Sequence, residues 1–211
     1  MKNKYLKPRV IAEIGCNHKG EMKIAKQLLK VAADSGVDVA KFQKRNNMEL
    51  LTNKQYNTTH PNPIHSYGNS YGEHREFLEF NLNQHKELKE YTESLGLIYS
   101  TSVWDATSAK EITSINPDLI KVPSACNYHF EILKILRDEY QGEVHISFGM
   151  TTQEEEEEIV AFFEESNQSN RLVLYSCTSG YPVPFDQTCL LEIKRLVDVG
   201  CKYIQIQNRF C

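Results

Sequence analysis

The feature that most constrains the fold is a regular alternation of short apolar runs with longer amphipathic stretches. The runs are rich in β-branched residues, and six of them fit strands at residues 10–15, 37–43, 97–102, 119–124, 144–149 and 172–177. The stretches that follow them fit helices at residues 22–35, 83–95, 106–115, 131–139, 152–165 and 185–199. This order is typical of parallel strands covered by helices, so the sequence predicts an α/β fold.

The chain length limits how complete such a fold is. A full barrel of eight β/α units typically needs about 250 residues, whereas this chain has 211. The sequence therefore predicts an incomplete TIM-type (β/α) barrel with about six to seven of the eight units. We expect it to form one partial-barrel domain over residues 1–211.

Composition and charge exclude several classes of partner. The net charge of −4 provides no basic surface for nucleic acid or for an anionic membrane. The N-terminus lacks the apolar core of a secretory signal, and no apolar run reaches the roughly 18 residues of a membrane span. Six cysteines are scattered without a CxxC pair, which favours reduced thiols. We therefore expect a cytoplasmic protein with a small-molecule partner.

One connection is unusually long. Residues 44–79 are polar, with several Pro, Gly, Asn and Tyr residues and three histidines. Loops of this length in compact domains are commonly functional lids or disordered segments. Because the segment follows the second predicted strand, we expect it to hang over the carboxyl-terminal mouth of the barrel.

Polar side chains recur where the predicted strands end. They are Glu13, Lys41, Gln43, Thr101, Lys121, Ser124, Ser147, Thr178 and Ser179. Strand alternation places Lys41 on the face of Val39 and Lys121 on the face of Leu119, so both lysines can point into the mouth. A buried lysine needs an anionic partner. Two lysines with hydroxyl groups nearby predict a site for a phosphate and a carboxylate on one small molecule; the alternative is that each is a surface residue.

Seven segments carry a resemblance to a known family. In chain order they are IAEIGCNHKG, VAKFQKR, YGNSYGEHREFLEF, YSTSVWD, IKVPSACN, ISFGMTT and CTSGYPVP. Together they resemble the N-acetylneuraminate (sialic acid) synthase family, including its bacterial legionaminic and pseudaminic acid relatives. The resemblance covers residues 10 to 192, approximately.

The resemblance implies an activity and a set of site residues. The family condenses phosphoenolpyruvate with an N-acetylated hexose such as N-acetylmannosamine, using a divalent metal, Mn or Mg, and it allows a homodimer. The catalytic residues it implies are Glu13, Lys41 and Lys121. The substrate-binding residues it implies are Asn17, His18, Gln43, Thr101, Ser124, Asn127, Ser147, Ser179 and Tyr181.

The chain departs from the family pattern at several of these positions. Ser176 stands where many relatives have a histidine, and Ser179 stands where some have an asparagine. The loop after Ser124 lacks the acidic residue that is common there. These departures leave the identity of the sugar open.

A larger departure concerns the metal. In the family, two histidines from the seventh and eighth strands bind it, but here the chain ends in VDVGCKYIQIQNRFC without either. The C-terminal antifreeze-like domain of many members is also missing. The seven histidines of the chain form no i, i+4 pair on a predicted helix, so we expect no metal ligands among its residues.

Three hypotheses follow from these observations. The first is a sialic-acid-type synthase, or the catalytic barrel of one. The second is a truncated, poorly stable fragment that keeps the substrate-binding residues and releases no phosphate, because open sheet edges remain in an unclosed barrel. The third is another phosphoenolpyruvate-using 3-deoxy-sugar-acid synthase, which the NH, EHRE and SGYP segments disfavour.

Overall fold

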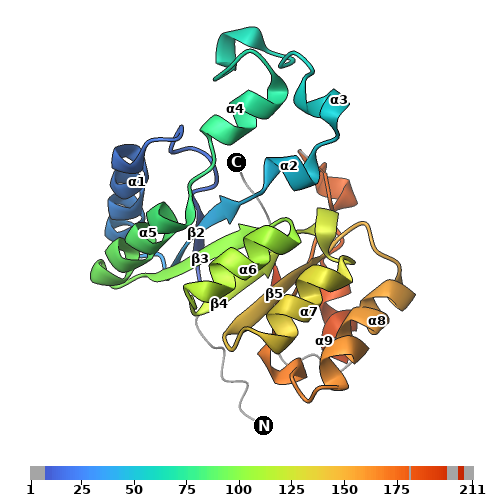
Figure 1. Cartoon of the computed structure of the whole chain (residues 1–211). Coiled ribbons are helices and arrows are strands. Elements are labelled where there is room, and N and C mark those ends of the chain that lie inside the picture. Colours follow the sequence, from blue (N-terminus) through green and yellow to red (C-terminus); the bar gives the residue numbers. More distant parts are fainter. Residues whose placement is uncertain (1–7, 181, 199–203, 207–211) are drawn as a thin grey trace. The chain divides into compact units, whose positions relative to one another are not determined.

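The computed structural model describes residues 8–180, 182–198 and 204–206 (Figure 1). Its strands are β1 (Ile11–Glu13), β2 (Val39–Lys44), β3 (Ile98–Val103), β4 (Leu119–Val122), β5 (Glu143–Phe148), β6 (Leu172–Ser176) and β7 (Ile204–Ile206). The longer helices are α1 (Met22–Asp34), α5 (Leu82–Ser94), α6 (Ala106–Ser114), α7 (Phe130–Asp138), α8 (Gln153–Glu164) and α9 (Glu192–Asp198). Strand order follows chain order, from β1 to β7. Successive parallel β/α units confirm the predicted α/β class. No helix in the described ranges is long and apolar enough to cross a membrane.

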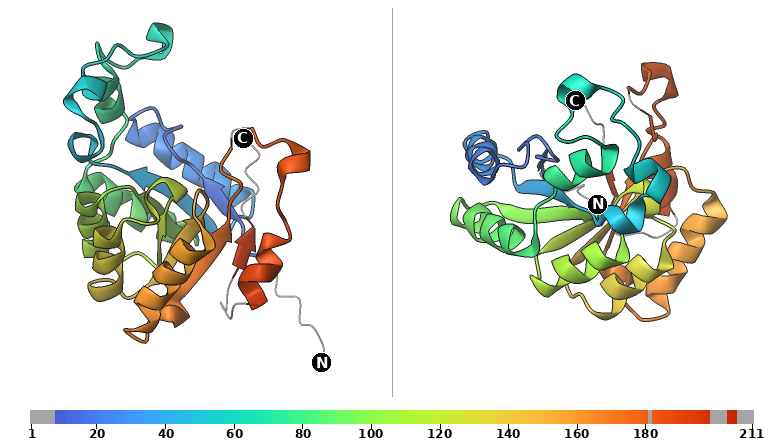
Figure 2. Two further views of the ribbon diagram at one scale, coloured as in Figure 1. Left: turned by 90° about the vertical axis from the view of Figure 1, so that its right-hand side faces the viewer. Right: turned by 45° about the horizontal axis from the view of Figure 1, so that its top comes forward.

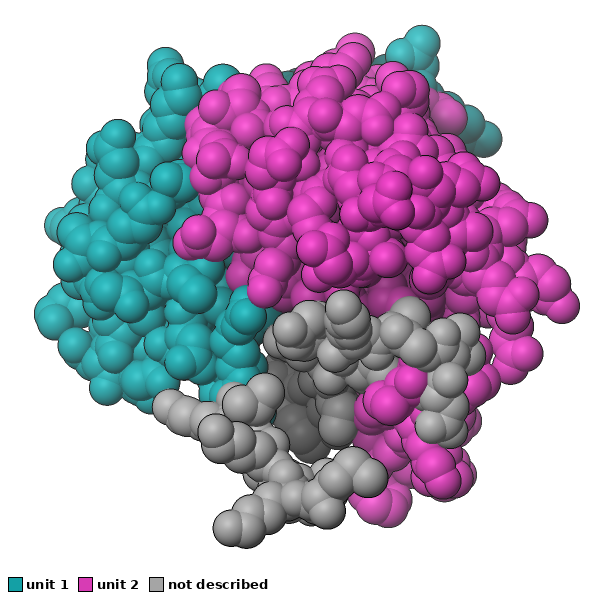
Figure 3. All heavy atoms as spheres, turned by 90° about the horizontal axis from the view of Figure 1, so that it is seen from below, with its two compact units in different colours: residues 1–43, 53–100 teal, residues 44–52, 101–211 magenta. Residues whose placement is uncertain are grey.

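The chain divides into two compact units (Figure 3). Unit 1 comprises residues 1–43 and 53–100, and unit 2 comprises residues 44–52 and 101–211. The prediction of one partial-barrel domain stays a prediction.

In unit 2, strand alternation separates an apolar face from a polar one. Figures 1 and 2 show α6, α7 and α8 over one face of the strands, where the core cluster contains Ile120, Val122, Val144, Ile146, Phe148, Leu172 and Leu174. The intervening residues point to the opposite face because side chains alternate along a strand. They include Lys121, His145, Ser147 and Tyr175, all buried. The helix-free face of unit 2 is therefore the polar one.

In unit 1, β1 and β2 pair in parallel, with Glu13 opposite Lys41. Helices α1 and α5 pack together, and Lys26 of α1 forms an ion pair of 2.6 Å with Glu87 of α5. The Phe42 ring stacks on Tyr99, with ring centroids 5.9 Å apart. This packing holds the carboxyl ends of β1 and β2 in place.

The long polar connection contains helices that were not predicted. It forms α2 (Asn47–Leu50), α3 (Asn53–Tyr56), a 3-10 turn (Pro63–His65) and α4 (Tyr71–Phe77). Ser70 caps the N-terminus of α4, because its side chain accepts a hydrogen bond from the backbone NH of Glu73. Gly72 allows the Tyr56 ring to lie directly against α4, since a Cβ there would overlap the ring. Short helices, and not an irregular loop, thus make up much of this segment.

The last predicted helix is wrong in its first half. The chain forms a 3-10 turn at Phe185–Gln187, and α9 begins only at Glu192. Phe185 is 98% exposed and Leu191 is 83% exposed, so the apolar residues behind the prediction contact no core before Leu196. Strand β7 was not among the six predicted strands; its backbone pairs with β6, with Ile206 opposite Ser176.

Gly20 and Gly36 provide a matched test of packing in unit 1. Their φ angles are +75° and +73°, so alanine at either position costs roughly 1–2 kcal/mol of backbone strain. A Cβ on Gly20 would also overlap the Phe77 carbonyl oxygen, whereas no described atom lies within 4 Å of one on Gly36. We expect G20A to lower the free energy of unfolding by about 2 kcal/mol more than G36A, measured by urea denaturation. Equal losses would contradict this packing.

Candidate functional site

The polar face of unit 2 carries Lys121 and Ser147 on neighbouring strands. Lys121 lies opposite His145, and Ser147 lies opposite Tyr175, so parallel pairing places all four on one face. Lys121 is 2% exposed, and its Nζ lies 5.7 Å from the centre of the Tyr175 ring. The buried Ser147 hydroxyl has no hydrogen-bond partner among the described residues. This hydroxyl can therefore donate to, or accept from, a further polar group on this face.

Two more predicted residues converge on Gly149, just beyond β5. A Cβ on Gly149 would lie 2.8 Å from the Ser124 hydroxyl oxygen and would overlap the Ser179 hydroxyl oxygen. Glycine therefore lets the loops after β4 and β6 approach the end of β5. The structure brings Ser124 and Ser179 together around this one position.

Asn127 connects the same loops through its side chain. It is buried, and its Nδ2 donates hydrogen bonds to the carbonyl oxygens of Ser147 at 2.8 Å and Gly149 at 3.2 Å. Both bonds tie the loop after β4 to the end of β5. Asn127, predicted to bind substrate, thus has its amide nitrogen engaged with the backbone, and contact with substrate stays a prediction.

Thr101 does not share the face of Lys121 by strand alternation. Two residues further along β3, Val103 belongs to the core cluster on the helix-covered face, and residues two apart point the same way. The Thr101 hydroxyl is buried without a described partner on that side. Ser102 was not among the predicted site residues. It has the opposite orientation from Thr101 and is also buried. The alternation of side chains along β3 could have identified Ser102 as the residue that faces away from the helices.

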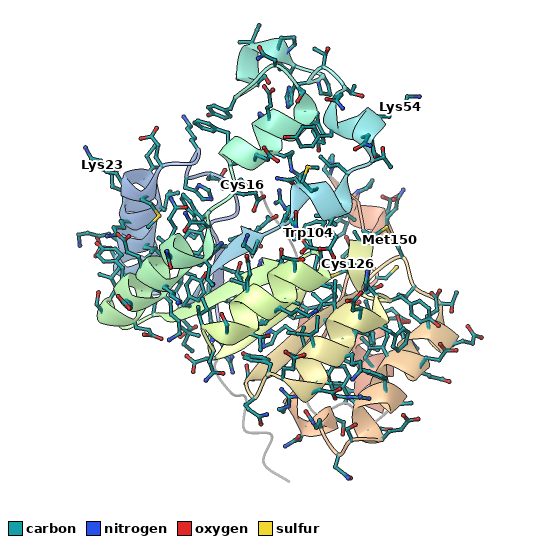
Figure 4. The ribbon with its side chains drawn as sticks, viewed as in Figure 1. Cys16, Lys23, Lys54, Trp104, Cys126 and Met150 are labelled. Atoms are coloured by element: carbon teal, nitrogen blue, oxygen red, sulfur yellow. The ribbon has the colours of Figure 1, made fainter. Side chains whose placement is uncertain are left out.

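Cys126 and Trp104 lie near the same strand ends in unit 2 (Figure 4). Burial raises the pKa of the Cys126 thiol to about 12, although Lys121 acts in the opposite direction. This thiol therefore remains protonated and is no nucleophile. Trp104 packs under the Arg45 guanidinium, 5.1 Å from the ring centre. Of these two residues, Cys126 is close enough to Lys121 to feel its charge.

Unit 1 carries its own charged pair at the ends of β1 and β2. Lys41 is 1% exposed, and its Nζ donates a hydrogen bond to Glu13 Oε2. Gln43 follows on the same face of β2, with its Nε2 3.5 Å from where a Cβ on Gly15 would be. The structure therefore brings three predicted residues, Glu13, Lys41 and Gln43, to one place. An ammonium, a carboxylate and an amide can bind an anion or sugar hydroxyl groups there.

Asn17 and His18 make local contacts in the loop after β1. Asn17 Nδ2 donates to the Ile14 carbonyl oxygen at 2.9 Å. The His18 ring is buried and stacks on Phe80 at 4.1 Å, and its Nδ1 accepts a hydrogen bond from the backbone NH of Gly20. Both side chains thus stabilise the loop, and their predicted contact with substrate stays a prediction.

A cavity of about 350 Å³ lies beyond the ends of β5 and β6 within unit 2. Ser176 and Thr178 line it, together with Met150, Thr151 and Cys177. Ser176 is the position where the resemblance leads one to expect histidine. Tyr181, the remaining predicted residue, lies outside the described residues.

We tested whether the described residues fit the metal that the resemblance implies. In the part of the chain that the structure describes, no three His, Cys, Asp or Glu side chains form a group that could hold a metal ion. The described residues therefore do not fit that metal.

The fold defines the class of this protein: it consists of parallel β/α units of the TIM-barrel type, in which active sites lie at the carboxyl ends of the strands. Residues 28–201 match the model of the NeuB family. The chain belongs to the NeuB family.

Named relatives agree with this assignment. The chain is 32% identical to human N-acetylneuraminate-9-phosphate synthase, over 82% of this chain and 47% of that protein. It is 27% identical to N,N'-diacetyllegionaminic acid synthase of Campylobacter jejuni, over 91% of this chain and 58% of that protein. The chain thus spans about half the length of these curated relatives.

A solved structure confirms the barrel type. The N-acetylneuraminic acid synthetase of Leptospira borgpetersenii superposes with a TM-score of 0.79 at 22% identity. The superposition covers 94% of this chain but 64% of that one. At this identity the likeness shows the fold alone, and it confirms the predicted incomplete TIM-type barrel.

Asn127→Asp tests the connection between the loops after β4 and β5. Aspartate has nearly the same shape but cannot donate to the carbonyl oxygens of Ser147 and Gly149. We expect N127D to lower the free energy of unfolding by about 2 kcal/mol, measured by urea denaturation. Asn57→Asp is the matched control, because exposed Asn57 donates one side-chain bond to the Asn53 carbonyl oxygen and should lose under about 0.5 kcal/mol. Equal effects would contradict the role of Asn127.

Proposed function

We propose that this chain binds phosphoenolpyruvate and forms part of an enzyme that condenses it with an N-acetylated hexose to give a sialic-type nonulosonic acid and phosphate. The observation that carries the proposal is the polar face of unit 2. There the buried ammonium of Lys121 lies on the same face as the Ser147 hydroxyl, which has no hydrogen-bond partner among the described residues. An anion with several oxygen acceptors suits both groups. Membership of the NeuB family supports this ligand class.

The proposed chemistry forms one carbon–carbon bond and releases one phosphate. The enol carbon of phosphoenolpyruvate attacks the aldehyde carbon of the sugar, whose oxygen takes up a proton. Water then adds to the cationic carbon that bears the phosphate, losing a proton, and the C–O bond to phosphate breaks. Lys121 is proposed to stabilise negative charge on the phosphate or carboxylate, an electrostatic effect worth several kcal/mol when the group is held in advance.

Unit 1 supplies the groups proposed for the sugar. Glu13 and Gln43 have oxygen and amide atoms that suit hydroxyl and N-acetyl groups, and Lys41 is held in place by its ion pair with Glu13.

The relatives differ in whether their product carries a phosphate on carbon 9: one is a synthase of N-acetylneuraminate 9-phosphate and another of N,N'-diacetyllegionaminic acid. Since phosphoenolpyruvate adds three carbons to a hexose, a phosphate on product carbon 9 comes from carbon 6 of the sugar.

Lys121→Met tests the phosphoenolpyruvate site. Methionine has a similar length but no charge, so at least one charge-assisted hydrogen bond to the ligand is lost. We expect the dissociation constant, measured by calorimetry, to rise about 10- to 100-fold. Lys134→Met is the matched control, because Lys134 of α7 is exposed and pairs with Asp138. Binding that survives K121M undiminished would refute the site.

Phosphate release tests whether these 211 residues also turn over. The described residues form no group that could hold a metal ion, which supports a second candidate, a chain that binds phosphoenolpyruvate without completing the reaction. We expect phosphoenolpyruvate binding but no phosphate release with N-acetylmannosamine and manganese, because the described residues provide no group of metal ligands. Clear release of phosphate would overturn this second candidate.

A panel of acceptors separates the sialic-type reaction from that of a 3-deoxy-sugar-acid synthase. It compares N-acetylmannosamine and its 6-phosphate with arabinose 5-phosphate and erythrose 4-phosphate. We expect binding of an N-acetylated hexosamine, detected by NMR with phosphoenolpyruvate present. Preference for either of the two non-acetylated sugar phosphates would contradict the proposed acceptor.

A further inference from the structure

Three hydrogen-bonded side chains on the polar face of unit 2 have no role in the proposed reaction. His145 of β5 is fully buried. Its Nδ1 lies 2.6 Å from the Tyr175 hydroxyl of β6, and its Nε2 lies 3.0 Å from Glu143 Oε2. Glu143 is partly exposed, so this hydrogen-bond network extends from the surface to the buried Tyr175.

The partners of His145 determine where its proton lies. A carboxylate only accepts hydrogen bonds, so Nε2 carries the proton that is donated to Glu143. In the neutral imidazole, Nδ1 then accepts the hydrogen bond that the Tyr175 hydroxyl donates. This bond fixes the position of the Tyr175 hydroxyl oxygen, and with it the long axis of the ring.

The Tyr175 ring connects this hydrogen-bond network to the proposed phosphoenolpyruvate site. Lys121 Nζ lies 5.7 Å from the ring centre, within the range in which a cation is attracted to an aromatic face. Tyr175 is also the strand partner of Ser147. The ring therefore adjoins both residues on which the proposed function rests.

We propose that Glu143, His145 and Tyr175 act as positioning residues, which hold the Tyr175 ring against Lys121 and so direct the Lys121 ammonium to the anion beside Ser147. The inference rests on the proposed function and deepens it. The alternative is a purely structural role, in which the three residues only satisfy each other's hydrogen bonds. The two hypotheses differ in whether replacing Tyr175 changes the position of the Lys121 side chain and its binding of the anion.

Two replacements of Tyr175 separate the ring from its hydroxyl. Tyr175→Phe keeps the ring but breaks the bond to His145, and Tyr175→Leu removes the ring as well. We expect the dissociation constant for phosphoenolpyruvate to rise about 3-fold in Y175F and about 10-fold or more in Y175L, the loss of one cation–π contact in a desolvated site. Tyr128→Phe is the control, because Tyr128 bonds Glu158 on the surface of unit 2. An unchanged constant in both Tyr175 variants would overturn the inference.

His145 is tested by NMR, without any ligand. We expect the ¹⁵N spectrum to show protonated Nε2 and unprotonated Nδ1, and His145→Asn to weaken phosphoenolpyruvate binding as much as Y175F does. His129→Asn, at the exposed start of α7, should leave binding unchanged. A proton on Nδ1 in the wild-type protein would contradict the proposed directions of the hydrogen bonds from Tyr175 to His145 and from His145 to Glu143.

The Lys121 side-chain resonance distinguishes failure of this inference from failure of the proposed function. It is identified by its loss in K121M and recorded in the full chain without ligand, with circular dichroism showing that each variant is folded. If the wild-type chain does not bind phosphoenolpyruvate, the proposed function fails. The inference then depends on Lys121 alone: a shifted resonance in Y175F, which keeps the ring but not its bond to His145, supports it, and an unshifted one overturns it.

Discussion

The constraint on which this structure depends is the burial of lysine ammonium groups at the ends of parallel strands. Lys41 is 1% exposed and Lys121 is 2% exposed, and an uncompensated buried charge costs several kcal/mol. Within unit 1 the carboxylate of Glu13 compensates Lys41. Within unit 2 the face of Tyr175 adjoins Lys121. Each lysine therefore requires particular neighbours on nearby strands: Glu13 on the adjacent strand β1 for Lys41, and Tyr175 two strands away on β6 for Lys121.

The strands of unit 2 show the effect of this requirement. Parallel strands covered on both faces are usually apolar almost throughout, but β4 and β5 alternate apolar residues with Lys121, His145 and Ser147. The apolar set packs under α6, α7 and α8, which stabilises the sheet. The polar set is buried without contributing to that core. Burying these polar side chains costs free energy that the apolar packing does not require, so we infer that they serve binding.

Most of the architecture could be predicted from the sequence, and the failures have physical causes. Helices α1 and α5 to α8 have an apolar stripe with a helical period, and their predicted bounds agree within a few residues. Helices α2, α3 and α4 are too short to show a period, and depend on caps such as Ser70 and on the contact of Tyr56 with Gly72. Residues 185–191 were misjudged because apolar residues there are exposed. The periodicity of apolar residues predicted a helix correctly where those residues are in fact buried.

The candidate site divides along the same line. Strand ends and parity identified Glu13, Lys41, Lys121 and Ser147, because register alone brings them beside their partners. Position within a segment could not show that His18 Nδ1 and Asn127 Nδ2 also bond the backbone, and the predicted contact of both residues with substrate stays a prediction. Parity along β5 could have singled out His145, two residues before Ser147. A polar residue in mid-strand that shares the face of a binding residue is thus itself evidence of a supported site, because only neighbours on that face can satisfy it.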